Sequence, residues 1–229
     1  MEGWKTEERL SKWAVEAALL RAGLSDHEKN MTFATFDPQR TAGPRVFELC
    51  KEYAEKVEKG MGIGLTLWGP RGVGKTHLAI AILREAVSRG LEGTKIPFAD
   101  LIAKGRSYFT EDELSEDFLD VEKFDLVVLD DLALQSIVGS YDSARACEVL
   151  FRFLDLCYIH RVNLIITTNH SPSELASELR RIDGSERILD RLRGLTWSVM
   201  VQGESQRAKE KEKRTPEWLK EKLQLVKEV

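Results

Sequence analysis

The chain has 229 residues, of which 42% are hydrophobic, and its formal net charge is −4. This length and composition allow one domain with a well-buried core plus a small appendage, and the acidic balance excludes a general electrostatic attraction to nucleic acid. The three cysteines lack C-x-x-C spacing, the four histidines are scattered, and no apolar run approaches the ~20 residues of a membrane span, so we expect a cytoplasmic protein without zinc or membrane contact.

The first predicted element is a helix over residues 5–24, inside an N-terminal segment that covers residues 1–31. Its apolar residues recur at spacings of three and four, at Leu10, Trp13, Ala17, Leu20 and Leu24. Two interpretations stay open. The helix packs on its own domain, or its large side chains, with Trp4 before them, dock a partner protein.

The main domain is expected over residues 32–207 and a charged helical tail over residues 208–229. Buried strands are predicted over residues 65–68, 94–98, 124–131, 162–168 and 195–201, with helical patterns between them. This alternation predicts an α/β fold, in which a parallel sheet has helices on both faces.

The turn after the first strand fits the phosphate-binding pattern G-x-x-x-x-G-K-[ST]. It runs through Gly69, Pro70, Arg71, Gly72, Val73, Gly74, Lys75 and Thr76, and His77 follows. Glycines let backbone N–H groups surround phosphates at a helix N-terminus, where the helix dipole favours anions. Lys75 supplies a charge for the β- and γ-phosphates, and the Thr76 hydroxyl supplies an oxygen for Mg²⁺. We therefore expect ATP or ADP with Mg²⁺ as cofactors.

Polar residues follow two later strands. Asp130 and Asp131 end the strand over residues 124–131, where Asp130 can hold Mg²⁺ and Asp131 can orient or polarise the attacking water. Asn169 follows the next strand. It either holds that water against the γ-phosphate or only turns the chain before a capping box.

Two arginines, Arg187 and Arg191, lie four residues apart on one face of a predicted helix. The nearby acids Asp183, Glu186 and Asp190 would give them ordinary surface ion pairs. In an ATPase that assembles side by side, one of these arginines would instead reach the γ-phosphate of a neighbouring subunit.

In their order and style these motifs resemble the AAA+ subfamily that holds the bacterial helicase loaders DnaC and DnaI and the transposition ATPase IstB. The resemblance covers residues 32–207, from Phe33-Ala34-Thr35-Phe36-Asp37-Pro38 to Gly203-Glu204-Ser205-Gln206-Arg207. It implies an AAA+ core without a separate C-terminal lid domain. The implied site residues are Lys75 and Thr76 of Walker A, Asp130 and Asp131 of Walker B, Asn169 as sensor 1, Arg187 as arginine finger and Arg191 as a second box VII arginine.

The resemblance also implies a function. It indicates an ATPase that forms a ring or spiral of identical subunits and loads a DnaB-type replicative helicase onto single-stranded DNA. Walker B departs from the family in ending with Asp131 rather than glutamate, and this shorter side chain predicts slow, regulatory turnover. The implied DNA contacts are Phe109, Ser140 and Tyr141, although packing against an adjacent helix is an equal alternative for them. The alternatives are an IstB-like ATPase that selects duplex target DNA for a transposase, and a nucleotide-gated binding module that hardly hydrolyses ATP.

Overall fold

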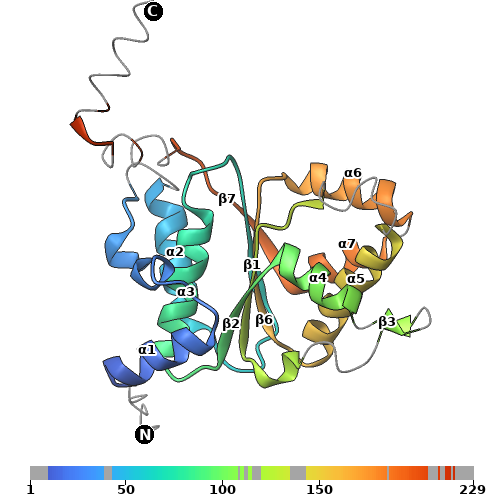
Figure 1. The fold of residues 1–229 in the computed structure, drawn as a ribbon, viewed down its shortest axis with the longest axis horizontal. Coiled ribbons are helices and arrows are strands. Elements are labelled where there is room, and N and C mark those ends of the chain that lie inside the picture. Colours follow the sequence, from blue (N-terminus) through green and yellow to red (C-terminus); the bar gives the residue numbers. More distant parts are fainter. Residues whose placement is uncertain are drawn as a thin grey trace, which may run out of the picture.

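A five-stranded parallel sheet forms the centre of the molecule in a computed structural model of the chain (Figure 1). The structure describes residues 10–38, 43–107, 109–110, 113–114, 120–134, 143–184, 186–205, 211, 215–217 and 219. The strands are β1 (Gly64–Trp68), β2 (Gly93–Pro97), β5 (Leu126–Asp130), β6 (Asn163–Thr168) and β7 (Thr196–Met200). Their order across the sheet is β2-β5-β6-β1-β7, and every neighbouring pair is parallel, as predicted.

Helices cover both faces of this sheet. On one side lie α1 (Lys12–Arg21), α2 (Gly43–Lys56) and α3 (Lys75–Ser88), and on the other lie α4 (Phe98–Ser107), α5 (Ser143–Ile159), α6 (Pro172–Asp183) and α7 (Arg187–Leu195) (Figure 1). Short 3-10 helices at Glu28–Asn30, Phe33–Thr35 and Val121–Lys123 join these elements. A small hairpin, β3 (Phe109–Thr110) with β4 (Glu113–Leu114), occupies part of the acidic stretch before β5.

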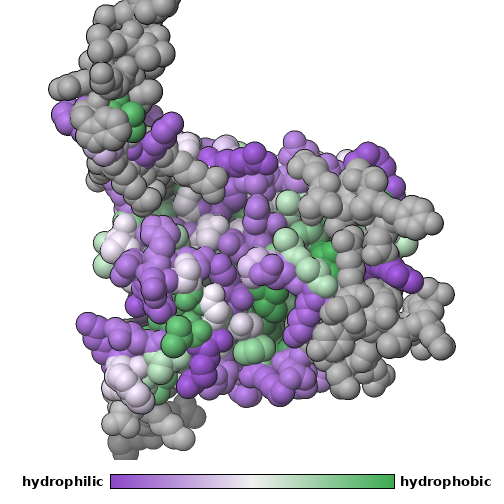
Figure 2. Space-filling model, viewed as in Figure 1, coloured by the Kyte–Doolittle hydropathy of each residue, from purple (hydrophilic) through white to green (hydrophobic). Residues whose placement is uncertain are grey.

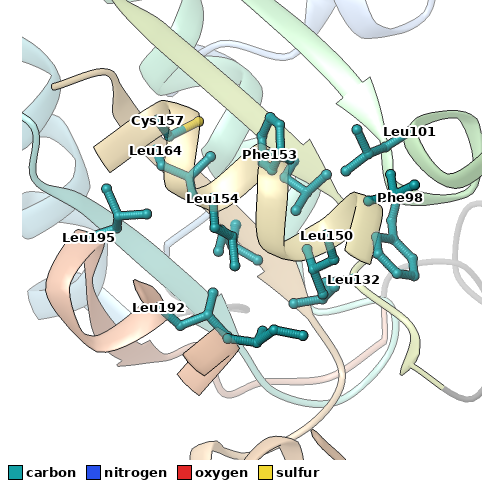
Figure 3. Close-up of a cluster of buried hydrophobic side chains, with 14 of the residues drawn as sticks. Phe98, Leu101, Leu132, Leu150, Phe153, Leu154, Cys157, Leu164, Leu192 and Leu195 are labelled. Atoms are coloured by element: carbon teal, nitrogen blue, oxygen red, sulfur yellow. The ribbon is translucent and has the colours of Figure 1, made fainter. Parts of the chain in front are cut away.

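Each helical layer has its own hydrophobic core against the sheet. One core gathers α2 and α3 with β1, and the other gathers α4, α5, α6 and α7 with β5 and β6. Figure 3 shows part of the second core, where Leu192 and Leu195 of α7 lie beside Leu154 of α5. The central strands are buried on both faces, which explains their continuous apolar sequences.

The topology creates a crevice at one edge of the sheet. Strands β1 and β6 are neighbours, yet the helix after β1 (α3) and the helix after β6 (α6) pack on opposite faces. The segments that follow these two strands therefore leave the sheet toward opposite faces, and ligands of open parallel sheets bind at such a point. The phosphate-binding turn and Asn169 both lie there.

The N-terminal helix packs on its own domain, but only part of the predicted stripe takes part. Leu19, outside the stripe, is fully buried against the core, and Leu24 of the stripe is buried as well, whereas Trp13 and Leu20 are 79% and 63% exposed. Backbone hydrogen bonds tie the segment to α3 and β2, from Leu10 N to Ser88 O (2.9 Å) and from Lys95 N to Ala22 O (3.0 Å). The interpretation of packing on the domain therefore holds for the Leu19 side, and the Trp13 side faces solvent.

The surface agrees with the composition. On the face shown in Figure 2 hydrophilic side chains predominate, and hydrophobic ones form small separated areas. Among the described residues no helix has the length and apolar character that a membrane crossing requires. Cys50, Cys147 and Cys157 are unbridged and buried, and burial raises the pKa of the Cys50 thiol to about 12.

Candidate functional site

The phosphate-binding turn joins β1 to α3 and has the backbone that its glycines permit. Gly72 and Gly74 have φ angles of 82° and 92°, in the left-handed region that side chains disfavour. A Cβ atom on Gly74 would lie 2.6 Å from the Phe36 ring, and one on Gly72 would lie 2.2 Å from Ser205 Oγ. The turn is thus packed tightly between two segments, the one before α2 that contains Phe36 and the one after β7 that contains Ser205.

Lys75 begins α3 and points back into the turn. Its ammonium group donates hydrogen bonds to the carbonyl oxygens of Gly69 (2.8 Å) and Pro70 (2.7 Å) and to Oδ1 of Asn169 (2.8 Å). The residue is only 8% exposed, so its charge is concentrated inside the loop. When a phosphate occupies the loop, the ammonium group of Lys75 would exchange these neutral acceptors for the charged phosphate oxygens, which bind an ammonium more strongly.

The next residue, Thr76, contacts the end of β5. Its hydroxyl donates to Oδ1 of Asp130 at 2.9 Å, and the hydroxyl of Thr167 donates to the same oxygen at 2.6 Å. The described residues contain no group of three His, Cys, Asp or Glu side chains that could hold a metal by themselves. Mg²⁺ is normally held by one or two carboxylates together with substrate phosphates and waters, so the pair of Thr76 and Asp130 fits this ion.

Asp131 has an unusual backbone conformation. Its φ is 55°, a left-handed value that aspartate tolerates better than most residues, and its N–H donates to Oγ1 of Thr167 at 2.8 Å. The side chain is exposed at the mouth of the crevice, where Oδ1 lies 3.4 Å from Nδ2 of Asn169. Asn169 thus contacts both Lys75 and Asp131.

Asn169 occupies this position because β6 lies between β5 and β1. The capping box predicted after it is present, with Ser171 as N-cap, Pro172 in the first turn and Glu174 closing the box. Asn169 therefore ends the strand before the cap and also contacts Lys75, and its role toward the attacking water stays a prediction.

Thr167 is a site residue that the sequence did not single out. It is 1% exposed, and its hydroxyl connects the Asp130 carboxylate to the Asp131 backbone. The adjacent Thr168 points to the other face and donates to Leu132 O at 2.8 Å. The sequence feature that could have indicated it is Thr167-Thr168-Asn169 at the strand end, where a threonine precedes the predicted site residue Asn169 by two positions.

His77 and Arg71 flank the turn in different ways. Nε2 of His77 lies 2.8 Å from Thr32 O and its ring packs edge-on against Phe36, with 5.2 Å between ring centroids, so this histidine holds the entry segment. Arg71 is exposed, whereas Val73 is buried in the core below the loop.

Arg187 and Arg191 both lie on α7 and contact α5. Arg187 pairs with Glu148 at 3.0 Å, and Arg191 Nε donates to Asp155 at 2.8 Å. Of the local acids predicted as partners, Asp190 lies 3.5 Å from Arg191, and Glu186 instead pairs with Arg180 and Arg193. The hydrogen bond that Arg191 donates to Asp155 raises the pKa of Arg191 above its usual value.

Of the three predicted DNA contacts, the structure describes the backbone of Phe109. Phe109 belongs to the β3–β4 hairpin, where its backbone pairs with Leu114. Ser140 and Tyr141 lie outside the described residues. Contact with single-stranded DNA therefore stays a prediction.

Comparisons with known proteins agree with this geometry. The model of the family described as IstB-like ATP binding protein matches residues 16–214. The Insertion sequence IS21 putative ATP-binding protein of Pseudomonas aeruginosa is 30% identical over 147 residues, 64% of this chain and 53% of that protein. The replicative helicase loader DnaC of Escherichia coli (strain K12) is 24% identical over 175 residues, 76% of this chain and 67% of that protein.

A crystal structure of the DnaC helicase loader has a similar fold, with a TM-score of 0.65 and 23% identity, covering 78% of this chain and 100% of that one. The expectation of an AAA+ core with a parallel sheet is therefore confirmed. The matched region spans about half of the IS21 protein's length.

Proposed function

This chain belongs to the family of IstB-like ATP-binding proteins, and on that premise we propose that it is an ATP-hydrolysing switch that loads a replicative DNA helicase. The observation that carries the ATPase part is the convergence of Lys75, Thr76, Asp130 and Asn169 at the carboxyl ends of three neighbouring strands. A phosphate loop, a metal-binding pair and a polar group facing them form the set that phosphoryl transfer requires.

Each residue has a defined task in this proposal. Lys75 leaves the loop carbonyls and binds the β- and γ-phosphates, while Thr76 and Asp130 would hold Mg²⁺, which offsets phosphate charge. Asp131 orients the attacking water, and Asn169 keeps Asp131 and the γ-phosphate in register. The side chain of Asp131 is shorter than that of a glutamate, and its backbone has a left-handed conformation. Its carboxylate therefore reaches less far toward the attacking water, and we expect slow turnover suited to a switch.

Assembly completes the site. Arg187 pairs with α5 of its own chain, and in our proposal it serves the nucleotide of the next subunit in a ring or spiral. Head-to-tail contacts of this kind generate rings or helices, and an arginine supplied from a neighbour couples hydrolysis to assembly. ATP would order the subunits, and hydrolysis would release them.

The helicase-loading part is supported by the relation to DnaC and by the exposed side of α1, which offers Trp13 and Leu20 to a partner, with the exposed Leu10 just before the helix. The test is a pull-down of a purified hexameric DnaB-type helicase with and without ATP, with Lys75→Ala as the matched control. We expect retention that depends on ATP and is lost in Lys75→Ala. Equal recovery of helicase and of an unrelated hexamer would overturn this part.

The second candidate is an ATPase that selects duplex target DNA for a transposase, favoured by the 30% identity to the IS21 protein. DNA titrations at fixed salt distinguish the two, because salt strongly affects such affinities. A loader should prefer single strands, with Phe109, Ser140 and Tyr141 as candidate contacts, whereas a target selector should prefer duplex. A cytoplasmic location is expected for both.

A further inference from the structure

One side of α5 carries acidic and aromatic residues in a regular pattern. Glu148, Phe151, Asp155 and Tyr158 follow one another at spacings of three, four and three, so they form a single stripe along the helix. The neighbouring positions Leu150, Phe153, Leu154 and Cys157 face the hydrophobic core (Figure 3). The stripe therefore lies beside the core-facing side of α5, and its Phe151 is a partly buried residue that packs against the edge of that core.

Arg187 and Arg191 of α7 each meet one carboxylate and one ring of this stripe. Arg187 lies 3.0 Å from Glu148, and its guanidinium carbon lies 4.4 Å from the centre of the Phe151 ring. We call Glu148 and Phe151 the finger clasp. Arg191 makes the same two kinds of contact with residues that lie seven positions further along α5.

Arg191 donates to Asp155 at 2.8 Å and lies 4.7 Å from the centre of the Tyr158 ring. We call Asp155 and Tyr158 the anchor clasp. A Cβ atom on Gly194 would lie 3.7 Å from the same ring, so α7 approaches α5 closely there. Two contacts of the same kind, four residues apart on α7 and seven residues apart on α5, fix both the register and the direction of α7 along α5.

The two clasps differ in exposure. The side chains of Arg191 and Asp155 are 30% and 17% exposed, whereas those of Arg187 and Glu148 are both 40% exposed. The anchor clasp lies beside the core residues Leu192 and Leu195, which suits a structural attachment. The finger clasp holds an arginine that solvent, or another molecule, can reach.

A clasp of this type suits a side chain that must act in trans. A free arginine samples many rotamers, and ordering it during the reaction reduces the rate. The ring holds the guanidinium by its face, so this contact does not use the N–H groups on its edge. The ion pair with Glu148 is exposed and therefore weak enough to be exchanged for a phosphate.

We propose that Glu148 and Phe151 are positioning residues, which order the guanidinium of Arg187 before the nucleotide of a neighbouring subunit reaches it. This inference rests on the proposed function, in which Arg187 completes that nucleotide site. It adds two residues on α5, far from the phosphate loop in sequence, to the requirements for hydrolysis.

The test measures steady-state ATP turnover of the full chain for Glu148→Gln, Phe151→Leu and Phe151→Tyr. Loss of pre-ordering for one side chain should lower kcat about threefold to tenfold in the first two variants, with KM unchanged. Phe151→Tyr keeps the ring and should restore most of the turnover lost in Phe151→Leu. The control is Glu55→Gln, an exposed glutamate on α2 in the other helical layer.

Double variants separate positioning from a general structural effect. If Glu148 and Phe151 act only through Arg187, adding Glu148→Gln or Phe151→Leu to Arg187→Ala should lower turnover no further. Thermal unfolding of each variant reports whether the fold survives, and Glu148→Gln keeps the test valid if Phe151→Leu does not fold.

The outcomes separate this inference from the function on which it rests. Normal turnover in Arg187→Ala would overturn the finger role and the clasp together. A strong loss in Arg187→Ala with wild-type turnover in Glu148→Gln and Phe151→Leu would overturn the clasp alone. Additive losses in the double variants would also reject the clasp, because the residues would then act independently of Arg187.

Discussion

Lys75 donates a hydrogen bond of 2.8 Å to the amide oxygen of Asn169, across the crevice between β1 and β6. Because a lysine ammonium only donates, this contact fixes the oxygen of the amide toward Lys75 and leaves its nitrogen toward Asp131. The residue that would bind phosphate and the residue that would orient water are thus linked through one neutral side chain. The choice of a neutral amide at this point can be tested directly.

Two substitutions of Asn169 should have different effects. Asn169→Ala removes the link to Asp131 and should lower hydrolysis about 10- to 100-fold while ATP affinity stays within about threefold, since positioning groups act mainly on the transition state. Asn169→Asp places a carboxylate beside Lys75, where it competes with phosphate and should lower ATP affinity at least about tenfold. Titration with a fluorescent ATP analogue, followed by turnover assays, measures both. Equal affinities in the two variants would contradict this role for the amide.

Thr167 should support Mg²⁺ binding through the hydrogen bond that its hydroxyl donates to the Asp130 carboxylate. Thr167→Val keeps the shape of the side chain but removes the hydroxyl that orients the carboxylate, and should raise the Mg²⁺ concentration needed for half-maximal turnover about tenfold or more. Thr168→Val is the matched control, because it loses an equally buried hydroxyl that bonds Leu132 O instead. Both should lose about 1–3 kcal/mol of stability. An equal Mg²⁺ requirement in both variants would reject the role.

The sequence predicted the residues of the site whose chemistry is tied to a motif or to a strand end. Lys75, Thr76, Asp130 and Asn169 follow from the loop pattern and from the rule that parallel strands end at one edge. Thr167 could not be identified, because a threonine in a buried strand is also an ordinary β-branched residue. The closing of the loop by Phe36 depends on how distant segments pack, which local spacing does not encode.

Arg187 should act on the neighbouring subunit. Arg187→Ala has an intact nucleotide site without a finger, and Asp131→Asn has a finger without a competent site, so each alone should keep only a low residual turnover while still binding ATP. In an equal mixture about a quarter of head-to-tail contacts join an intact site to an intact finger, and turnover should rise toward that share of wild type.

The control for this mixture replaces Asp131→Asn by the double variant Asp131→Asn/Arg187→Ala. That chain supplies neither part, so its mixture with Arg187→Ala should stay at the low residual turnover. Turnover of the first mixture at the mean of its two components would show that Arg187 does not act in trans.

Arg187 and Arg191 also mark a limit of sequence reasoning about the fold. Helical spacing places the two on one face, but their main partners Glu148 and Asp155 lie on another helix, more than thirty residues earlier. The N-terminal helix presents a related difficulty. It has apolar residues on several faces, and packing against α3 selects the Leu19 side, which the spacing alone did not favour.

The N-terminal segment should detach from the sheet edge in acid. Glu28 and Lys95 form an ion pair with 14% and 9% of their side chains exposed. Burial by itself would raise the pKa of Glu28, but the hydrogen bonds from Lys95 and Ser25 outweigh it and hold the pKa below its ordinary value. A lowered folded pKa stabilises the fold above about pH 4.3, and this stability is lost as the pH falls through the folded pKa. The midpoint of urea unfolding should therefore drop in that acid range, and less so in Glu28→Gln.

Removal of the partner gives a test of the same ion pair at neutral pH. Lys95→Met leaves a buried carboxylate without its cation and should cost about 3 kcal/mol of unfolding free energy. The matched control is Lys56→Met, which breaks the exposed pair with Glu52 and should cost less than about 1 kcal/mol. Similar costs for both variants would mean that the Glu28–Lys95 pair is no more important than a surface contact.

The exposed side of α1 should bind the helicase partner. Trp13 is 79% exposed and therefore contributes little to the core, so Trp13→Ala should leave the unfolding free energy within about 0.5 kcal/mol of wild type. If Trp13 is a central contact in a complex, its truncation should cost about 2–4 kcal/mol of binding, which weakens helicase affinity more than tenfold. Affinity is measured by titration with a purified hexameric helicase in ATP.

Leu19 on the same helix provides the opposite control. It is fully buried against the domain, so Leu19→Ala should lower the unfolding free energy by about 2–5 kcal/mol. At a temperature where it remains folded, its helicase affinity should fall less than that of Trp13→Ala, because Leu19 does not reach the exposed face. Unchanged helicase affinity in Trp13→Ala would reject docking through this side of α1, and the helix would then serve only to cover α3 and the edge of the sheet.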